Sequence, residues 1–438
     1  MAQRIVRRTL SLSSGVALGQ LAVMASTPIL TRLCTPDDFG IFAFLYTFIT
    51  LFGIVGLLQL EVDIPLCDDD ELPIALLAQA GVGLAMLSSI LVVIALLTTT
   101  VDLLDRLPLW ALLLLPLSCL LQIVLLPAAY LHVRSGSFSL YGMQRMNRLL
   151  GQAGGQVALC WFELGSIGLL GGLIVGQIVA LVTGIRAFWS AVSGIRWVHR
   201  RAIVSYLRRK YEYPCYILPA NIFSSSMHLL PSVLVGSVFS AKEAGLLLLV
   251  QRLFAVPVRL VSHNVSQVLL GELRTIDPAA LRRLTRRSMA VMAAAGLAIA
   301  GIVVLPGEAG WTLMLGPGWN DFWYLLLCFT PLQTVTFVSE AARNLFLIVD
   351  KRLMIWQSGG GFAALGIFLL PLVAPLTFYD VVIAYVGAAT LVQVVPLFVL
   401  VRRLDTMATL SRNTADSPAD RSSSTHHSAV AALGKSES

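Results

Sequence analysis

The sequence predicts an all-α integral membrane protein with about twelve transmembrane helices in two six-helix bundles, related by a pseudo-twofold axis along the membrane normal. Three observations predict this class. Hydrophobic residues make up 57% of the chain and charged residues only 13%, with a mean hydropathy of +0.81, which lies outside soluble usage. Apolar runs of about 20 residues recur, the length that spans a bilayer core. Finally, the two halves of the chain resemble each other.

Apolar windows of about 18 to 25 residues define the predicted spans. The first follows a basic start and is too long for a signal-peptide core, so we expect it to be retained. The fifth contains NRLLGQAGGQVALCWFEL, which is Gly-rich and polar, so we expect it to pack inside a bundle. The predicted spans lie near 11–33, 41–64, 73–99, 107–130, 146–164, 167–189, 214–238, 245–270, 288–306, 321–345, 354–375 and 380–401.

Lys and Arg concentrate in alternate loops. Three precede the first span, three lie at 134–148, six at 196–210 and five at 274–287, whereas the opposite loops carry little beyond Arg32, Arg106 and Lys242. By the positive-inside rule the rich loops and both termini are cytoplasmic. The net charge of +7 therefore reflects topology and does not indicate a nucleic-acid partner.

The repeat appears when the chain is shifted by 205 positions. LCTPDDFGIFAFLY from Leu33 then lies over VFSAKEAGLLLLVQ from Val238, and Gly40 aligns with Gly245. Six spans per half keep both copies in one orientation, although a chance match in apolar sequence is the alternative. We expect bundles at 1–205 and 206–404, and a disordered cytoplasmic tail at 405–438, where Ser and Thr predominate.

Ionisable residues in the eighth span are the first candidates for a site. Arg252, Arg259 and His263 follow one another by seven and four positions, which places them on one helical face. Pro257 lies between the arginines and is expected to kink the helix. A cationic stripe suits a water-filled anion pathway. The alternative is that both arginines snorkel or make structural pairs.

Carboxylates near the spans are candidates for ion coupling. Glu340 is expected near the bilayer middle in the tenth span, where it could exchange a proton as the halves move, or simply pair with Arg343 one turn away. Glu61 and Asp63 near the cytoplasmic end of the second span are further candidates. We expect no cofactor, apart from coupling to H⁺ or Na⁺.

The sequence gives little indication that the protein is an enzyme. The acidic run Asp68–Glu71 could suggest a metal-diphosphate site, but such sites use two Asp-rich motifs and the sequence has this one, so a solvated loop is favoured. The six cysteines form no CxxC pair, and neither a metal site nor a disulfide framework is expected. Nucleotide-binding and hydrolase motifs are absent from the sequence.

Several segments resemble the bacterial polysaccharide-transport family, which includes O-antigen-type flippases of lipid-linked oligosaccharides. This family is related to MATE-like multidrug exporters and lipid II exporters in the multidrug/oligosaccharidyl-lipid/polysaccharide exporter superfamily. The chain departs from the family at Gln59, where a basic residue is expected before LE. The matching segments are TPILTRLCTPDDFGIF, LEVDIPL, YGMQRMNRLLGQAGGQ, AGLLLLVQRLFAVPVRLVSHNVSQV and MLGPGWND.

The resemblance implies alternating-access transport of an undecaprenyl-diphosphate-linked oligosaccharide across the bacterial inner membrane, from the cytoplasmic to the periplasmic leaflet, for O-antigen, capsule or exopolysaccharide synthesis. Arg252 and Arg259 would meet the diphosphate. Arg32 would meet the departing headgroup or pair with Asp37 or Asp38. The cationic lining of this path would comprise Arg252, Arg259, His263, Arg32 and Arg343.

Further expected partners are membrane lipids, a glycan polymerase and a chain-length regulator. The rivals are a drug or metabolite exporter of the same fold and a membrane glycan polymerase or ligase. A cationic-drug exporter would favour carboxylates in its cavity. A polymerase or ligase would be expected to carry a long periplasmic loop, and every predicted periplasmic loop is short.

Overall fold

A computed structural model describes residues 2–100, 109–193, 199–257, 278–349 and 351–415, and within these ranges the chain is helical without strands. The first bundle holds six long helices. The second of these helices starts with a capping box between Thr35 and Asp38, and Pro36 occupies its first position. These helices are α1 (Ala2–Leu33), α2 (Pro36–Val55), α3 (Leu72–Thr100), α4 (Leu109–Arg134), α5 (Phe138–Trp161) and α6 (Gly165–Ser193).

The second bundle follows a short linking helix, α7 (Arg200–Arg209), and a π-helical turn at Tyr213–Ile217. Its last helix, α15, starts with a cap in which Asp380 accepts hydrogen bonds from Thr377. The elements are α8 (Leu218–Val238), α9 (Ala241–Pro257), α11 (Pro278–Val304), α12 (Gly307–Leu315), α13 (Phe322–Val349), α14 (Lys351–Ala364), a 3₁₀ turn at Leu365–Leu372 and α15 (Phe378–Ala415).

The protein is a multi-pass membrane protein. Eight described helices are long and apolar enough to cross a bilayer, or nine if the bent pair Tyr213–Phe223 and Ser225–Val238 is one span. Three shorter or more polar elements, α5, α9 and α14 with its 3₁₀ turn, occupy the positions of the fifth, eighth and eleventh predicted spans. The described helices are thus consistent with twelve spans, a number that stays a prediction.

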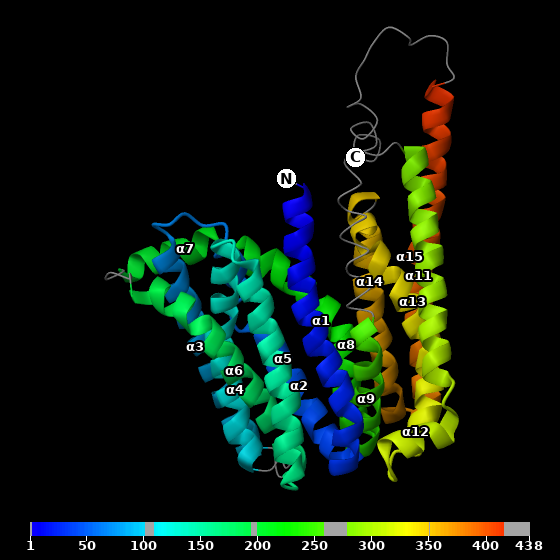
Figure 1. Cartoon of the computed structure of the whole chain (residues 1–438), viewed down its shortest axis with the longest axis horizontal. Coiled ribbons are helices and arrows are strands. Elements are labelled where there is room, and N and C mark those ends of the chain that lie inside the picture. Colours follow the sequence, from blue (N-terminus) through cyan, green and yellow to red (C-terminus); the bar gives the residue numbers. More distant parts are fainter. Residues whose placement is uncertain (1, 101–108, 194–198, 258–277, 350, 416–438) are drawn as a thin grey trace.

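The two groups of helices meet at one end and diverge toward the other (Figure 1). α12 and the start of α9 lie at the first end, called here the α12 end. The N-terminus of α1 and the linking helix α7 lie at the other, called here the N-terminal end. The domain boundary predicted at residue 205 falls inside α7 and stays a prediction.

Two expectations about helix ends are wrong. The second span was expected to run to residue 64, but α2 ends at Val55, and Leu58 and Gln59 adopt positive φ angles of 53° and 61°. These angles are incompatible with a continuous right-handed helix. The tail was expected to begin at residue 405, but α15 continues to Ala415. Arg282 and Arg286 of α11 form ion pairs with Asp405 at 2.7 Å and hold this extension.

Glycine allows α5 and α6 to pack closely. A Cβ atom on Gly172 would lie 2.2 Å from the backbone nitrogen of Gln156, and one on Gly176 would lie 2.3 Å from the carbonyl oxygen of Arg148. Both distances are shorter than atoms tolerate, so only glycine fits. Small residues at such contacts hold helices together in membranes. The Gly-rich α5 is therefore packed tightly on α6 along one face, while Leu150 and Trp161 on α5 are exposed, so the expectation of a fully internal helix is met on one face only.

The bundles touch through a second pair of glycines, and this contact repeats with the 205-residue shift. A Cβ atom on Gly40 would lie 1.9 Å from the carbonyl oxygen of Ala241, and one on Gly245 would lie 2.0 Å from that of Pro36. Shifting Gly40 and Pro36 by 205 gives Gly245 and Ala241. Each half thus presents the same two positions to the other, as expected for a local twofold axis between α2 and α9.

We expect Gly40→Ala to lower the thermal stability of the protein, because the new methyl group must push the α2 and α9 backbones apart. Overpacking of this kind costs about 1–3 kcal/mol. Gly81→Ala in α3 is the matched control, since a Cβ there meets no atom within 4 Å. The measurement is thermal unfolding in one detergent, and equal melting temperatures for the two variants would contradict the tight contact.

Candidate functional site

Arg252 projects from α9 between the helices of the first bundle. Its Nη2 donates to the carbonyl oxygen of Val23 in α1 and to Oε1 of Gln156 in α5, both at 3.3 Å. The Gln156 amide is oriented by its own hydrogen bond, 2.9 Å long, to the carbonyl oxygen of Leu169. Among the residues that the structure describes, no carboxylate forms an ion pair with Arg252. Two neutral oxygens thus hold this guanidinium, and the described residues supply no negative charge to compensate it.

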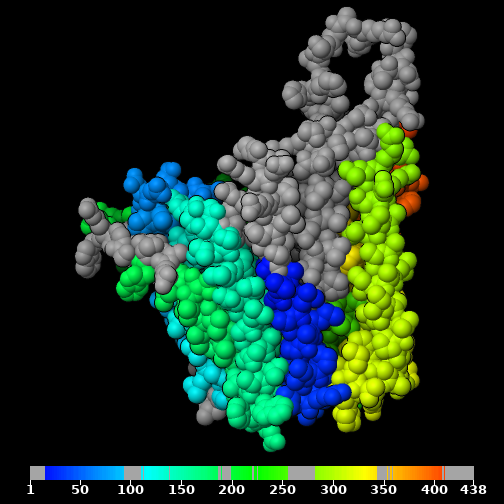
Figure 2. Space-filling model, in the orientation of Figure 1, coloured from blue at the N-terminus to red at the C-terminus, as the bar shows by residue number. Residues whose placement is uncertain are grey.

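An apolar slot of about 400 Å³ lies beside Arg252. On the α1 side the slot reaches the molecular surface, because Leu21 is 51% exposed. The α1 surface in turn lies between those of α5 and α12 (Figure 2). Among the described lining residues Arg252 is the one charged group and Thr27 the one other polar group, a combination that suits a ligand with an anionic group and a hydrocarbon part. The described lining residues are Leu21, Met24, Ala25, Thr27, Pro28, Leu249, Arg252, Leu253, Trp311, Met314, Leu315 and Phe322.

A second cation is Arg148, which the sequence analysis counted among the loop cations; it lies well inside α5, which begins at Phe138. Arg148, Gln152 and Gln156 follow one another at intervals of four residues and share one helical face. Both glutamines are buried and Arg148 is half-buried. Tyr46 of α2 is an electrostatic neighbour of both Arg148 and Arg252. Arg148 of α5 and Arg252 of α9 therefore both lie near Tyr46 of α2. The four-residue spacing was the signal that could have revealed Arg148.

The side chains of the other cations predicted from the eighth and tenth spans lie outside the part of the chain that the structure describes. Arg259 and His263 lie outside the described residues, and the described part of Arg343 is its backbone in α13. Glu340 in α13 is half-buried. The stripe on the eighth span and the role of Glu340 stay predictions.

Arg32 lies at the α12 end and ties α1 to the second bundle. Its Nη2 donates to the carbonyl oxygen of Leu313 in α12 at 2.8 Å. The carboxylate of Asp38, one of its expected partners, accepts instead from the backbone nitrogens of Thr35 and Ser166. A second bond joins the bundles nearby, since Trp319 Nε1 donates to the carbonyl oxygen of Thr31 at 2.9 Å.

The two carboxylates after α2 have different environments. Asp63 accepts hydrogen bonds from the hydroxyl groups of Tyr206 and Tyr213 and an ion pair from Lys210 at 2.8 Å. Burial, followed by the bond to Asp63, raises the pKa of Tyr206. Glu61 is equally buried, but within the described ranges its Oε2 has no hydrogen-bond partner. Asp63 is thus a structural anchor, while the Glu61 carboxyl is only partly hydrogen-bonded by the described residues.

The acidic run after this turn is bound to neighbouring helices. Glu71 forms an ion pair with Arg209 of α7 at 2.9 Å, and Arg134 at the end of α4 pairs with Asp69. Within the described ranges, no group of three or more His, Cys, Asp or Glu side chains could hold a metal ion. These acids connect α3, α4 and α7 at the N-terminal end.

Comparison with known proteins identifies relatives of the chain. Residues 29–323 match the family model described as "Polysaccharide biosynthesis protein". Among curated proteins, none matches the sequence. The fold is similar to that of the lipid II flippase MurJ in an inward closed conformation, with a TM-score of 0.64 and 10% identity, over 98% of this chain and 95% of that one.

An inward-facing multidrug resistance MATE family transporter of the MOP superfamily is also similar, with a TM-score of 0.58 and 13% identity, over 92% of this chain and 96% of that one. Likenesses at such identities show the fold, whereas the family model covers most of the chain. The two-bundle membrane architecture predicted from the sequence is therefore confirmed. The chain belongs to the polysaccharide biosynthesis protein family and has the fold of the MOP-superfamily transporters.

Proposed function

We propose that the protein is a flippase that moves an undecaprenyl-diphosphate-linked oligosaccharide between the leaflets of the bacterial inner membrane by alternating access. It would supply O-antigen, capsule or exopolysaccharide synthesis. The observation that carries the proposal is Arg252, a cation without a described ion-pair partner on the wall of an apolar slot. A MOP-type transporter also fits the matched family and the fold.

The chemistry of the slot matches a lipid with a charged headgroup. A charged side chain within a membrane helix is costly and generally lies at a functional site. A diphosphate would compensate Arg252, because a guanidinium donates two parallel hydrogen bonds to phosphate oxygens. The apolar residues of α1 and α12 offer a surface for the prenyl chain.

The rival functions fit less well. An exporter of cationic drugs needs carboxylates in its binding region, whereas the described slot contains a cation. A glycan polymerase needs acid and base groups; none is found in the slot lining. A glycan polymerase and a chain-length regulator are proposed partners, because they would act on the oligosaccharide after it has been flipped.

The orientation is also a proposal. Exposed arginines cluster at the N-terminal end on α7 and at the start of α11, which favours a cytoplasmic location of this end by the positive-inside rule. Transport would then run toward the α12 end. Arg32 lies there and would be the last cation along the path.

We expect Arg252→Gln to reduce flipping of the lipid-linked oligosaccharide by about 10- to 100-fold, since a hydrogen bond to a charged group contributes about 1.5–3 kcal/mol. The assay reconstitutes the full chain in vesicles and measures how much lipid-linked oligosaccharide an impermeant oxidant reaches. Arg283→Gln, an exposed arginine of α11, is the control with the same charge change. Equal rates in both variants would remove Arg252 from the path.

In cells lacking the protein, the lipid-linked oligosaccharide should build up on the cytoplasmic face, and wild type should cure this build-up while Arg252→Gln does not. If cells that lack the protein show no such build-up, the alternative function, export of a drug or metabolite, would be favoured.

Ion coupling is a second part of the proposal, with Glu61 and Glu340 as its candidates. Glu61 lies between the candidate spans that end at Val55 and begin at Leu72, and burial raises its pKa from 4.5 to about 7. A carboxyl with such a pKa takes up and releases protons near physiological pH. If a proton or Na⁺ gradient drives transport through Glu61 or Glu340, the Gln variant of that residue should lose the dependence on the gradient.

The raised pKa of Glu61 also predicts how stability depends on pH. The folded protein keeps the proton that the unfolded chain loses, so the free energy of unfolding falls as pH rises from about 4.5 to about 7. The full effect is of the order of 3 kcal/mol. Glu61→Gln should lack this decrease when thermal unfolding of both proteins is followed over the same pH series. Parallel pH profiles would show that Glu61 titrates normally.

A further inference from the structure

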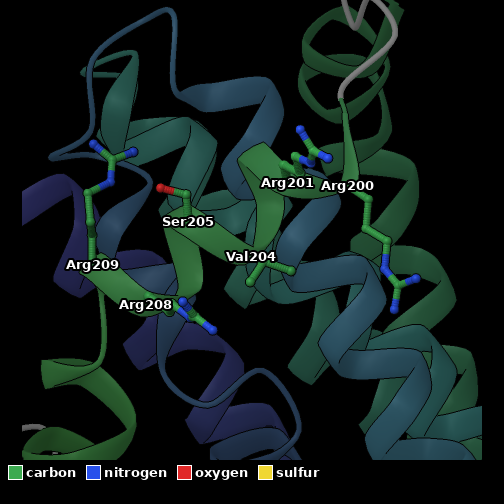
Figure 3. A pocket seen from close by; sticks show the side chains of 6 residues that line it. All are labelled: Arg200, Arg201, Val204, Ser205, Arg208 and Arg209. Atoms are coloured by element: carbon green, nitrogen blue, oxygen red, sulfur yellow. The ribbon is translucent and has the colours of Figure 1, made fainter.

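The linking helix α7 presents four arginines on its outer face. Their side chains frame Val204 and Ser205 and line a groove of about 620 Å³. Arg200 and Arg208 point to one edge of this groove, and Arg201 and Arg209 point to the other (Figure 3). All four are exposed.

The inner face of α7 fixes the helix to the first bundle. Tyr206 is fully buried against Ala75 and Ala78 of α3, and Ile203 and Leu207 pack beside it. The hydroxyl of Tyr206 is bonded to Asp63 at 2.7 Å. Packing therefore determines which side of α7 faces outward, and the arginines occupy that side.

The outer face lacks matching negative charge in the described part of the chain. Arg209 pairs with Glu71, but no ion pair is found there for Arg200, Arg201 or Arg208. Like charges on neighbouring turns of a helix repel one another. A face of this kind is stabilised by an external anion.

The depth of α7 indicates which anion. The helix lies crosswise to the long helices at the N-terminal end of the molecule (Figure 1). It packs on Leu72 and Ile74, the first turn of a candidate span that begins at Leu72. α7 is therefore at the level where α3 enters the bilayer, which is the level of lipid headgroups.

We propose that the outer face of α7 binds the phosphate headgroups of anionic phospholipids in the adjoining leaflet. Guanidinium groups match the geometry of phosphate oxygens, and clusters of Lys and Arg beside membrane helices bind anionic leaflets. Val204, 42% exposed between the arginines, offers an apolar contact, as in helices that lie in the interface. The bound lipid would anchor the segment that joins the two bundles. This inference does not rest on the proposed transport function.

The test titrates the full chain in detergent micelles with phosphatidylglycerol or phosphatidylcholine and counts bound lipids by native mass spectrometry. The test variant is Arg200→Gln/Arg201→Gln/Arg208→Gln. The matched control is Arg283→Gln/Arg287→Gln/Arg402→Gln, which removes the same charge from exposed arginines of α11 and α15. We expect about tenfold weaker binding of phosphatidylglycerol to the test variant, unchanged binding of phosphatidylcholine, and a control close to wild type.

Equal losses in both triple variants would show attraction by net charge alone and overturn the site on α7, as would wild-type binding by the test variant. Displacement of phosphatidylglycerol by an equal concentration of inorganic phosphate, but not of sulfate, would assign the groove to free phosphate instead. Melting temperatures measured in neutral lipid check that the variants are folded. If the triple variant unfolds, the single variants Arg208→Gln and Arg287→Gln are compared instead. Weaker phosphatidylglycerol binding by Arg208→Gln alone would support the site on α7, and equal binding would overturn it.

Discussion

The close backbone contact between α2 and α9 is the interaction on which the arrangement of the two bundles depends. Lipid offers no hydrophobic driving force for helix association, so close packing has to hold membrane helices together. Gly40 and Gly245 allow each backbone to reach the carbonyl oxygen of the other helix. Trp319 extends this contact, because its ring meets Phe39 edge-on at 5.2 Å and its nitrogen binds Thr31. The bundles are closed at the α12 end for this reason.

Away from this contact, the compensation of buried charge separates structural groups from candidate functional ones. Asp63 has three donors and is a structural group. Arg252 is half-buried and has two neutral acceptors at 3.3 Å, with no ion-pair partner among the described residues. Removing an ion from water without pairing it is costly. A fold that keeps Arg252 in this state gains from any anion that enters the slot, and this makes it the stronger candidate for a binding residue.

The sequence predicted the features that are encoded locally. The repeat was visible because Gly40 and Gly245, and the charged residues just before them, stand at equal spacing. The structure adds that Thr35 and Ser240, at the same spacing, accept hydrogen bonds from the backbone at the starts of α2 and α9. Arg148 was missed because it was counted with the loop cations, although α5 begins at Phe138, eight residues before the predicted span. The turn after α2 was missed because Leu58 and Gln59 adopt left-handed conformations without a glycine. Gln59, the departure from the family pattern, accepts a hydrogen bond from Asn221 of α8 at 2.8 Å, a contact between distant segments that no local pattern encodes.

The same turn determines where the two bundles can move relative to each other at the N-terminal end. Asp63 holds Tyr206 and Lys210, which belong to the linker, and also Tyr213, which begins the π-helical turn leading into α8. Separating α7 from the first bundle would leave Asp63 buried and unpaired, which is costly. π-helical turns are weak points that often mark functional sites. We therefore infer that α7 moves with the first bundle and that bending occurs beyond it, at the π-helical turn Tyr213–Ile217 or at the 55° break between Phe223 and Ser225.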